Sequence, residues 1–144
     1  MNQVVKILNE QLSDWSLLFV KLHNYHWNVK GRDFFTLHEK FEGLYNEAAG
    51  HIDEIAERIL ALGEVPAGSL KEYLELATLE EATGNEDARG MVEQIVADFK
   101  AIVASAKNGA EVAGAAGDET TVDLLAQIYV SLEKHIWLLT AFLG

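Results

Sequence analysis

Four long stretches of the chain repeat apolar residues every three or four positions, which is the spacing of helices that bury one face. They span residues 3–29, about 34–62, 91–106 and about 122–144. In the first stretch the repeat consists of Leu8, Leu12, Trp15, Phe19 and Leu22. No segment alternates apolar and polar residues with a period of two, so we expect no strands.

Turn and capping residues separate these stretches. The turn at residues 30–33 ends the first predicted helix, and Gly63 followed by Pro66 is a common stop signal for the second. Ser69 and Glu72 have the spacing of a capping box, in which each side chain bonds the backbone near the other. They predict a short helix between the second and third long helices.

Together these elements predict an all-α protein with a single domain over residues 1–144. The Asn108-Gly109 pair and the Ala/Gly-rich stretch up to Gly117 predict the end of the third long helix. Two long helices, a short helix ending near Ala77 and two further long helices make a four-helix bundle with a long crossover between its second and third helices.

The composition is that of a folded acidic protein. Hydrophobic residues make up 49% of the 144 positions, and 23 Asp and Glu against 11 Lys and Arg give a net charge of −12. This charge repels phosphate, which disfavours nucleic acids and anionic membranes as partners and favours cations. The absence of cysteine excludes disulfides and thiolate metal sites. Without a long apolar run or a secretion signal, we expect a cytoplasmic protein with no membrane contact.

The second predicted helix has three faces, where an ordinary amphipathic helix has two. Its apolar face, which we expect in the core, contains Leu37, Phe41, Leu44, Ala48, Ile52, Ile55 and Ile59. A second side, which we expect to be solvated, contains Lys40, Glu47, His51, Glu54 and Arg58. A third sector along the edge of the apolar face contains His38, Glu42, Asp53 and Glu57. Because imidazoles and carboxylates bind divalent metals, this third sector is a candidate metal site.

The spacing within that sector favours a metal site shared by two chains. His38 and Glu42 are one turn apart, as are Asp53 and Glu57, so each pair can bind one cation. The pairs are roughly 22 Å apart along the axis, too far for one ion to contact both in one chain. They are symmetric about the middle of the helix, so two antiparallel copies around a two-fold axis would set each pair against its partner's other pair. The small residues 48–50 near that centre allow a close approach.

His26 extends the candidate site to the first helix. It lies at the end of that helix's apolar stripe, and a hairpin of the first two helices would bring it near His38. Each candidate has an ordinary alternative: an inward histidine commonly makes a core hydrogen bond, and the Asp53 and Glu57 pair followed by Arg58 is commonly a surface salt-bridge pattern. The symmetric placement of the whole set favours the metal site over these alternatives.

Four segments of the sequence resemble the Dps family of mini-ferritins. They are HNYHW (23–27), FFTLHEKFE (34–42), DEIAERI (53–59) and KHIW (134–137). The resemblance extends over nearly the whole chain. It implies a ferritin-like four-helix bundle with a short extra helix between helices 2 and 3, assembled as a homo-oligomer, a hollow twelve-subunit shell.

The resemblance also implies a ferroxidase site for iron between subunits at two-fold axes. Its ligands fall on His26, His38 and Glu42 of one subunit and on Asp53 and Glu57 of the neighbour. Many members have Asp at the position of Glu42, which leaves open whether Glu42 binds iron directly or through water. The family further implies that hydrogen peroxide oxidises Fe(II) in preference to O2 and that ferric mineral collects in the cavity.

Other residues acquire a role through the same resemblance. Trp27 is implied as an electron relay, with packing at a subunit contact as the alternative. Glu119 and Asp123, one turn apart, fall where the family has an acidic three-fold pore, although the helix dipole alone also favours acidic residues at a helix start. Glu47 and Glu54 are candidate mineral-nucleation residues if their face lines the cavity.

Many members of the family bind DNA through lysine-rich tails, so a structural DNA-condensing protein is the alternative function. Neither end of this sequence has a basic extension, and its 11 basic residues are scattered. With a net charge of −12 we expect weak or no DNA binding, and iron detoxification as the function. A third class, the di-iron oxygenase within one chain, is disfavoured because it uses Glu-x-x-His motifs on two helices and the sequence has none.

Overall fold

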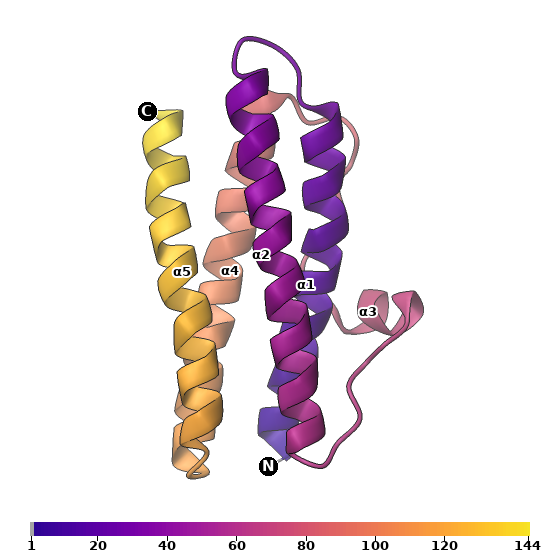
Figure 1. Cartoon of the computed structure of the whole chain (residues 1–144), viewed down its shortest axis with the longest axis vertical. Coiled ribbons are helices and arrows are strands. Elements are labelled where there is room, and N and C mark those ends of the chain that lie inside the picture. The colour runs from indigo at the N-terminus through magenta and orange to yellow at the C-terminus, as the bar shows by residue number, and fades with distance from the viewer. Residues whose placement is uncertain (1) are drawn as a thin grey trace.

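The computed structural model describes residues 2–144, and no strand lies within that range. The helices are α1 (Asn2–Asn28), α2 (Phe34–Ala61), α3 (Leu70–Leu76), α4 (Ala88–Ala115) and α5 (Glu119–Leu143). α1 and α2 form one antiparallel hairpin, α4 and α5 form another, and the short α3 projects beside α1 (Figure 1). The predicted four-helix bundle with a short helix in the crossover is confirmed. Over residues 2–144, none of the helices combines the length and apolarity needed to cross a membrane.

The core is built from large side chains of all four long helices. Trp15 of α1, Phe41 of α2, Phe99 of α4 and Leu132 of α5 are at most 1% exposed. Burying each such side chain stabilises the fold by roughly 1.5–3 kcal/mol. The predicted apolar face of α2 is confirmed, with Ile52 only partly buried and the other members buried.

The predicted turns and caps of the first half are confirmed. Gly31 and Gly63 have φ of 105° and 88°, in the left-handed region that favours glycine. At the start of α3, Ser69 Oγ accepts a hydrogen bond from the Glu72 amide at 3.2 Å, and Glu72 accepts one from the Gly68 amide at 3.2 Å. The first bond satisfies an amide that the first turn of a helix leaves free, and the second bonds the residue before the cap to the helix.

The third long helix ends within the predicted stretch, at Ala115 just before Gly117, so that prediction is confirmed. The Asn108-Gly109 pair does not interrupt it, because α4 continues unbroken through both residues. Gly109 has a packing role instead. A Cβ placed on it would lie 2.8 Å from Ile7 of α1 and 2.9 Å from Leu125 of α5, so a larger residue would force these side chains to shift. A sequence pattern cannot distinguish a glycine that breaks a helix from one that lets two helices touch.

The prediction that one side of α2 is solvated is also wrong, since most of that side faces other helices. Glu47 accepts hydrogen bonds from Ser131 and His135 of α5 at 2.8 and 2.9 Å. Arg58 donates to Asp118, immediately before α5, at 2.7 Å. Of the five residues on this side only Glu54 is exposed. A helical wheel assigns charged residues to solvent, whereas here they pair with polar groups across a helix seam.

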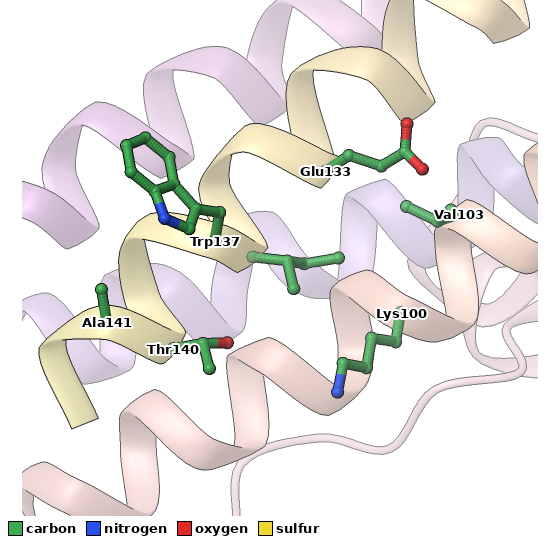
Figure 2. Close-up of a pocket in the computed structure, with 7 residues that line it drawn as sticks. Lys100, Val103, Glu133, Trp137, Thr140 and Ala141 are labelled. Carbon is green, nitrogen blue, oxygen red and sulfur yellow. The ribbon is translucent and has the colours of Figure 1, made fainter. Parts of the chain in front are cut away.

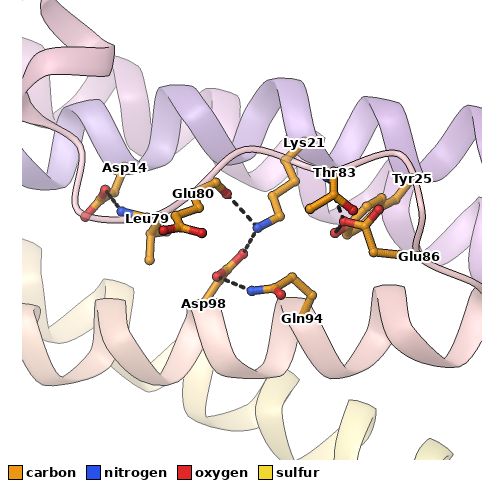
Figure 3. A network of polar contacts seen from close by, with 9 residues as sticks. All are labelled: Asp14, Lys21, Tyr25, Leu79, Glu80, Thr83, Glu86, Gln94 and Asp98. Atoms are coloured by element: carbon orange, nitrogen blue, oxygen red, sulfur yellow. Dashed lines mark hydrogen bonds and ion pairs between the residues drawn. The ribbon is translucent and has the colours of Figure 1, made fainter.

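Polar side chains of α1 fix the crossover between α2 and α4 along the bundle (Figure 3). Asp14 accepts hydrogen bonds from the amides of Thr78 and Leu79 at 2.7 and 3.1 Å. Lys21, which is buried, forms an ion pair of 2.8 Å with Asp98 of α4 and donates to the backbone carbonyl of residue 80 at 2.7 Å. The crossover is therefore held in place by side-chain bonds although most of it has no regular secondary structure.

Candidate metal centre

His26 and His38 hold each other in place across the turn between α1 and α2. Nδ1 of His26 lies 2.7 Å from the backbone carbonyl oxygen of His38, and Nδ1 of His38 lies 2.7 Å from that of His26. Because a carbonyl oxygen only accepts, both Nδ1 atoms carry a proton. In the neutral imidazoles the lone pair is then on Nε2, which is the arrangement of metal-binding histidines whose Nδ1 bonds a carbonyl.

Neighbouring rings restrict the same two imidazoles. The rings of His26 and His38 stack with centroids 3.8 Å apart and 13° between their planes. Phe34 also stacks on His38, at 4.9 Å and 22°, and Tyr45 meets His26 edge-on at 5.3 Å. Both imidazoles are thus oriented before any metal arrives.

Glu42 adds a carboxylate to this pair. Its Oε1 lies 3.9 Å from Nε2 of His26, and its side chain is 52% exposed. Two ligand atoms that each lie about 2.1 Å from a metal ion are at most about 4.2 Å apart, so an ion fits between these two atoms. We call His26, His38 and Glu42 the histidine half-site.

Asp53 and Glu57 form a second group, the carboxylate half-site, nearer the other end of α2. Both side chains are exposed, and they are one turn apart. The hydrogen bond with Asp53, together with the negative charge of Asp53, raises the pKa of Glu57. Two carboxylates one turn apart on an exposed helix face can both contact one cation, whose positive charge offsets their mutual repulsion.

The structure keeps these half-sites apart within one chain. α2 is continuous from Phe34 to Ala61, so His38 and Asp53 are roughly 22 Å apart along its axis. Within residues 2–144, no three His, Asp or Glu side chains are arranged to hold a metal ion. A centre that used both half-sites would take one of them from a second chain.

The middle of α2, between the half-sites, presents small residues to solvent. Ala49 and Gly50 are exposed, and nothing lies within 4 Å of a Cβ placed on Gly50. Ala48 differs from them because it is fully buried in the core of its own bundle. Two of the three small residues singled out in the sequence are thus available for a close approach of another helix.

Trp27 lies beside the histidine half-site and is 68% exposed. Its ring is 5.4 Å from that of His23, which in turn stacks on Tyr45 at 3.7 Å. His23 Nδ1 lies 2.7 Å from the carbonyl oxygen of Phe19, so His23 has a packing role. These contacts connect the exposed indole to the rings around His26.

The predicted pore residues lie at the start of α5. Glu119 and Asp123 are exposed. Asp118, next to them, is buried and has a structural role: it caps the Thr121 amide at 3.1 Å and pairs with Arg58. Burial raises the pKa of Asp118, but the hydrogen bonds from Thr121 and Arg58 outweigh it, and the net pKa is below its ordinary value.

A polar network around Glu47 escaped the sequence reasoning. Glu47 accepts hydrogen bonds from Nε2 of His51 and of His135, each at 2.9 Å, and Lys40 Nζ lies 3.1 Å from Nδ1 of His135. Burial raises the pKa of Glu47, but these histidines and Ser131 lower it more, so it lies well below its usual range. The signal was present in the spacing, since Glu47 and His51 are one turn apart on α2, as are Ser131 and His135 on α5.

A cavity of about 690 Å³ opens between α4 and α5, away from both half-sites (Figure 2). Its walls are Lys100, Val103, Glu133, Ile136, Trp137, Thr140 and Ala141. With one carboxylate and no histidine, this cavity lacks the ligand set of the two half-sites.

Comparison with known proteins identifies the family to which this chain belongs. The ferritin-like domain family matches residues 5–144. "DNA protection during starvation protein 2" of Bacillus anthracis is 57% identical over 142 residues, which cover 99% of this chain and 97% of that protein. "General stress protein 20U" of Bacillus subtilis is 53% identical over 142 residues, with 99% and 98% covered.

Solved structures of Dps proteins are also similar to this chain. A Dps protein from Bacillus brevis superimposes with a TM-score of 0.98 at 52% identity, covering 99% of this chain and 96% of that one. The Dps protein of Vibrio cholerae, described as a member of the ferritin-like diiron-carboxylate superfamily, superimposes with a TM-score of 0.96 at 35% identity, covering 99% and 90%. The chain therefore belongs to the ferritin-like domain family and, within it, to the Dps proteins.

Proposed function

We propose that this protein is a ferroxidase that oxidises Fe(II) with hydrogen peroxide at sites shared by two subunits, and that it stores the ferric product inside a hollow homo-oligomeric shell. The observation that carries the proposal is the division of the ligands along α2 into a histidine half-site and a carboxylate half-site. Kinship with a ferritin-like diiron-carboxylate protein supports iron as the metal.

In this proposal two copies of α2 pack antiparallel around a two-fold axis. His26, His38 and Glu42 of each subunit then meet Asp53 and Glu57 of the other, so that each dimer has two centres. The exposed small residues between the half-sites give the helices room to approach. A shell of twelve subunits built from such dimers is the assembly that we propose.

The ligand set suits a metal that arrives as Fe(II) and leaves as Fe(III). Neutral imidazoles and carboxylates bind Fe(II) without the tight grip of thiolates. The negative charges of Glu42, Asp53 and Glu57 stabilise the more highly charged product. Two ferrous ions each give one electron to one molecule of hydrogen peroxide, which takes up two protons and becomes two molecules of water. Paired electron transfer releases no hydroxyl radical, and O2 is the slower oxidant.

Supporting roles follow from the positions of three other residues. Trp27 is proposed as an electron relay, because it is exposed and its ring contacts His23, which stacks on the Tyr45 ring beside His26. Glu119 and Asp123 are proposed to line a route for Fe(II) into the shell, because both are exposed and acidic at the start of α5. Glu47 is not proposed for mineral nucleation, since its carboxylate already accepts three hydrogen bonds.

DNA condensation is the alternative function, and the name of the Bacillus anthracis relative refers to DNA protection. The net charge of −12 on each chain opposes contact with phosphate. We propose that any protection of DNA is indirect and comes from removal of Fe(II) and peroxide. A mobility shift of plasmid DNA by the metal-free protein at moderate salt and neutral pH would favour the alternative.

The proposal is tested by comparing peroxide-driven Fe(II) oxidation by the wild-type protein and by Asp53→Ala. We expect the variant to sediment like the wild type but to lose rapid oxidation. Glu39→Ala is the matched control, because it removes an exposed carboxylate from the same helix outside both half-sites. Equal oxidation rates for Asp53→Ala and the wild type would refute the assignment.

A further inference from the structure

The imidazole of His38 is held in place by stacked rings as well as by its hydrogen bond. Two rings stack on its imidazole, that of His26 with centroids 3.8 Å apart and that of Phe34 with centroids 4.9 Å apart. The bond from Nδ1 to the carbonyl of His26 then sets which edge of the ring points outward. Together these contacts determine where Nε2 lies.

Phe34 is itself well anchored. It is the first residue of α2, one turn before His38, and its amide donates to the carbonyl of Gly31 at 3.1 Å. Its ring is partly buried and packs against the core. A side chain one turn earlier on a helix lies directly beside the later one, so the helix itself brings the two rings together.

We infer that Phe34 is a positioning residue of the proposed centre: its ring holds the His38 imidazole in the orientation that presents Nε2 to the metal. This inference rests on the proposed function and adds a residue that does not itself bind metal. Without the ring, His38 keeps only one of its two stacking neighbours and gains rotational freedom that metal binding must remove. Ordering one side chain on binding lowers affinity about threefold to tenfold.

The test uses Co(II) as a probe of the assembled, metal-free protein, with its dissociation constant measured by equilibrium dialysis. Phe34→Leu removes the ring and Phe34→Tyr keeps it. Phe35→Leu is the matched control, because Phe35 is the next residue, is 83% exposed and is not within stacking distance of His38. Sedimentation and the thermal midpoint establish that each variant is folded and assembled. Phe34→Met, which fills similar volume without a ring, replaces Phe34→Leu if the latter does not assemble.

We expect Phe34→Leu to bind Co(II) about threefold to tenfold more weakly, with Phe34→Tyr and Phe35→Leu within about twofold of the wild type. The Fe(II) concentration for half-maximal oxidation should rise by the same factor as the Co(II) dissociation constant, while the maximal rate changes little. Wild-type Co(II) binding by Phe34→Leu, or equal weakening by Phe34→Tyr, would overturn the inference.

The same titration separates this inference from the proposed function. If Asp53→Ala binds Co(II) as tightly as the wild type, the shared centre itself is wrong. If Asp53→Ala loses binding while Phe34→Leu retains it, the centre stands and only the role of Phe34 is wrong.

Discussion

The hydroxyl of Tyr25 donates a hydrogen bond of 2.6 Å to Oε2 of Glu86 and so joins the end of α1 to the crossover just before α4 (Figure 3). Tyr25 is fully buried, and Glu86 also accepts from the amides of Thr83 and Gly84 at 3.0 and 2.9 Å. Tyr25 directly precedes His26 in α1. The hydrogen bond to Glu86 therefore attaches the crossover to the part of α1 that carries a residue of the histidine half-site.

Replacing Tyr25 with Phe should destabilise the protein by about 1.5–3 kcal/mol, because a hydrogen bond to a charged group contributes that much. The measurement is the free energy of unfolding in urea at neutral pH. Tyr73→Phe is the control, since it removes a hydroxyl from a partly buried tyrosine of α3. Equal stability of Tyr25→Phe and the wild type would show that the bond contributes nothing.

The stability difference between Tyr25→Phe and the wild type should depend on pH through Glu86. Burial raises the pKa of Glu86, but the hydrogen bonds from Tyr25 and Thr83 lower it more, to about 2 from an ordinary 4.5. A lowered folded-state pKa stabilises the fold above the ordinary value, and this contribution is lost as pH falls toward the folded-state value. The difference should stay constant above about pH 5 and shrink below it, as urea titrations at each pH would measure.

Lys21→Met should be among the most damaging substitutions outside the half-sites. Lys21 and Asp98 are buried, with their charged atoms 2.8 Å apart, so the variant leaves Asp98 as an unpaired buried charge. We expect a loss of about 3–5 kcal/mol in the free energy of unfolding. The double variant Lys21→Met, Asp98→Leu removes both charges and should recover most of the loss; a double variant as unstable as the single one contradicts this explanation.

Gly109→Ala should destabilise the bundle by about 1–3 kcal/mol, because the new methyl group overlaps Ile7 and Leu125. Gly114→Ala in the same helix is the control. A Cβ there has its nearest neighbour at 3.7 Å, and alanine favours the helix, so stability should be unchanged or rise by about 0.5–1 kcal/mol. Thermal or urea unfolding of both variants distinguishes the packing role from a simple helix propensity effect.

These substitutions also mark what the sequence could predict. The bundle, the short α3 and the apolar face of α2 follow from periodicity and caps, which are local properties of the chain. Gly109 and the Glu47 network were misjudged because their roles depend on partners on α1 and α5 that are far away in sequence. The sequence shows the residues of each contact but not how the helices that carry them are aligned against one another.

For the candidate site, too, the sequence predicted which residues lie close together but not how their side chains are oriented. The hairpin prediction that His26 lies near His38 is confirmed by two reciprocal hydrogen bonds. The stacking of Phe34 on His38 was within reach, since the two are one turn apart, but sequence spacing does not specify ring orientation. The meeting of the two half-sites involves a second chain and stays a prediction.

That meeting can be tested by mixing two inactive subunits. His38→Ala disables the histidine half-site and Asp53→Ala the carboxylate half-site, so each variant alone should lack rapid Fe(II) oxidation. Co-expressed in equal amounts with different tags, they form mixed dimers in which one centre carries both substitutions and the other carries none. Half of the dimers are mixed, and half of their centres are intact, so the mixed shells should have about a quarter of wild-type activity. A centre contained within one chain predicts no recovery, and mixed shells without activity would therefore rule out the shared centre.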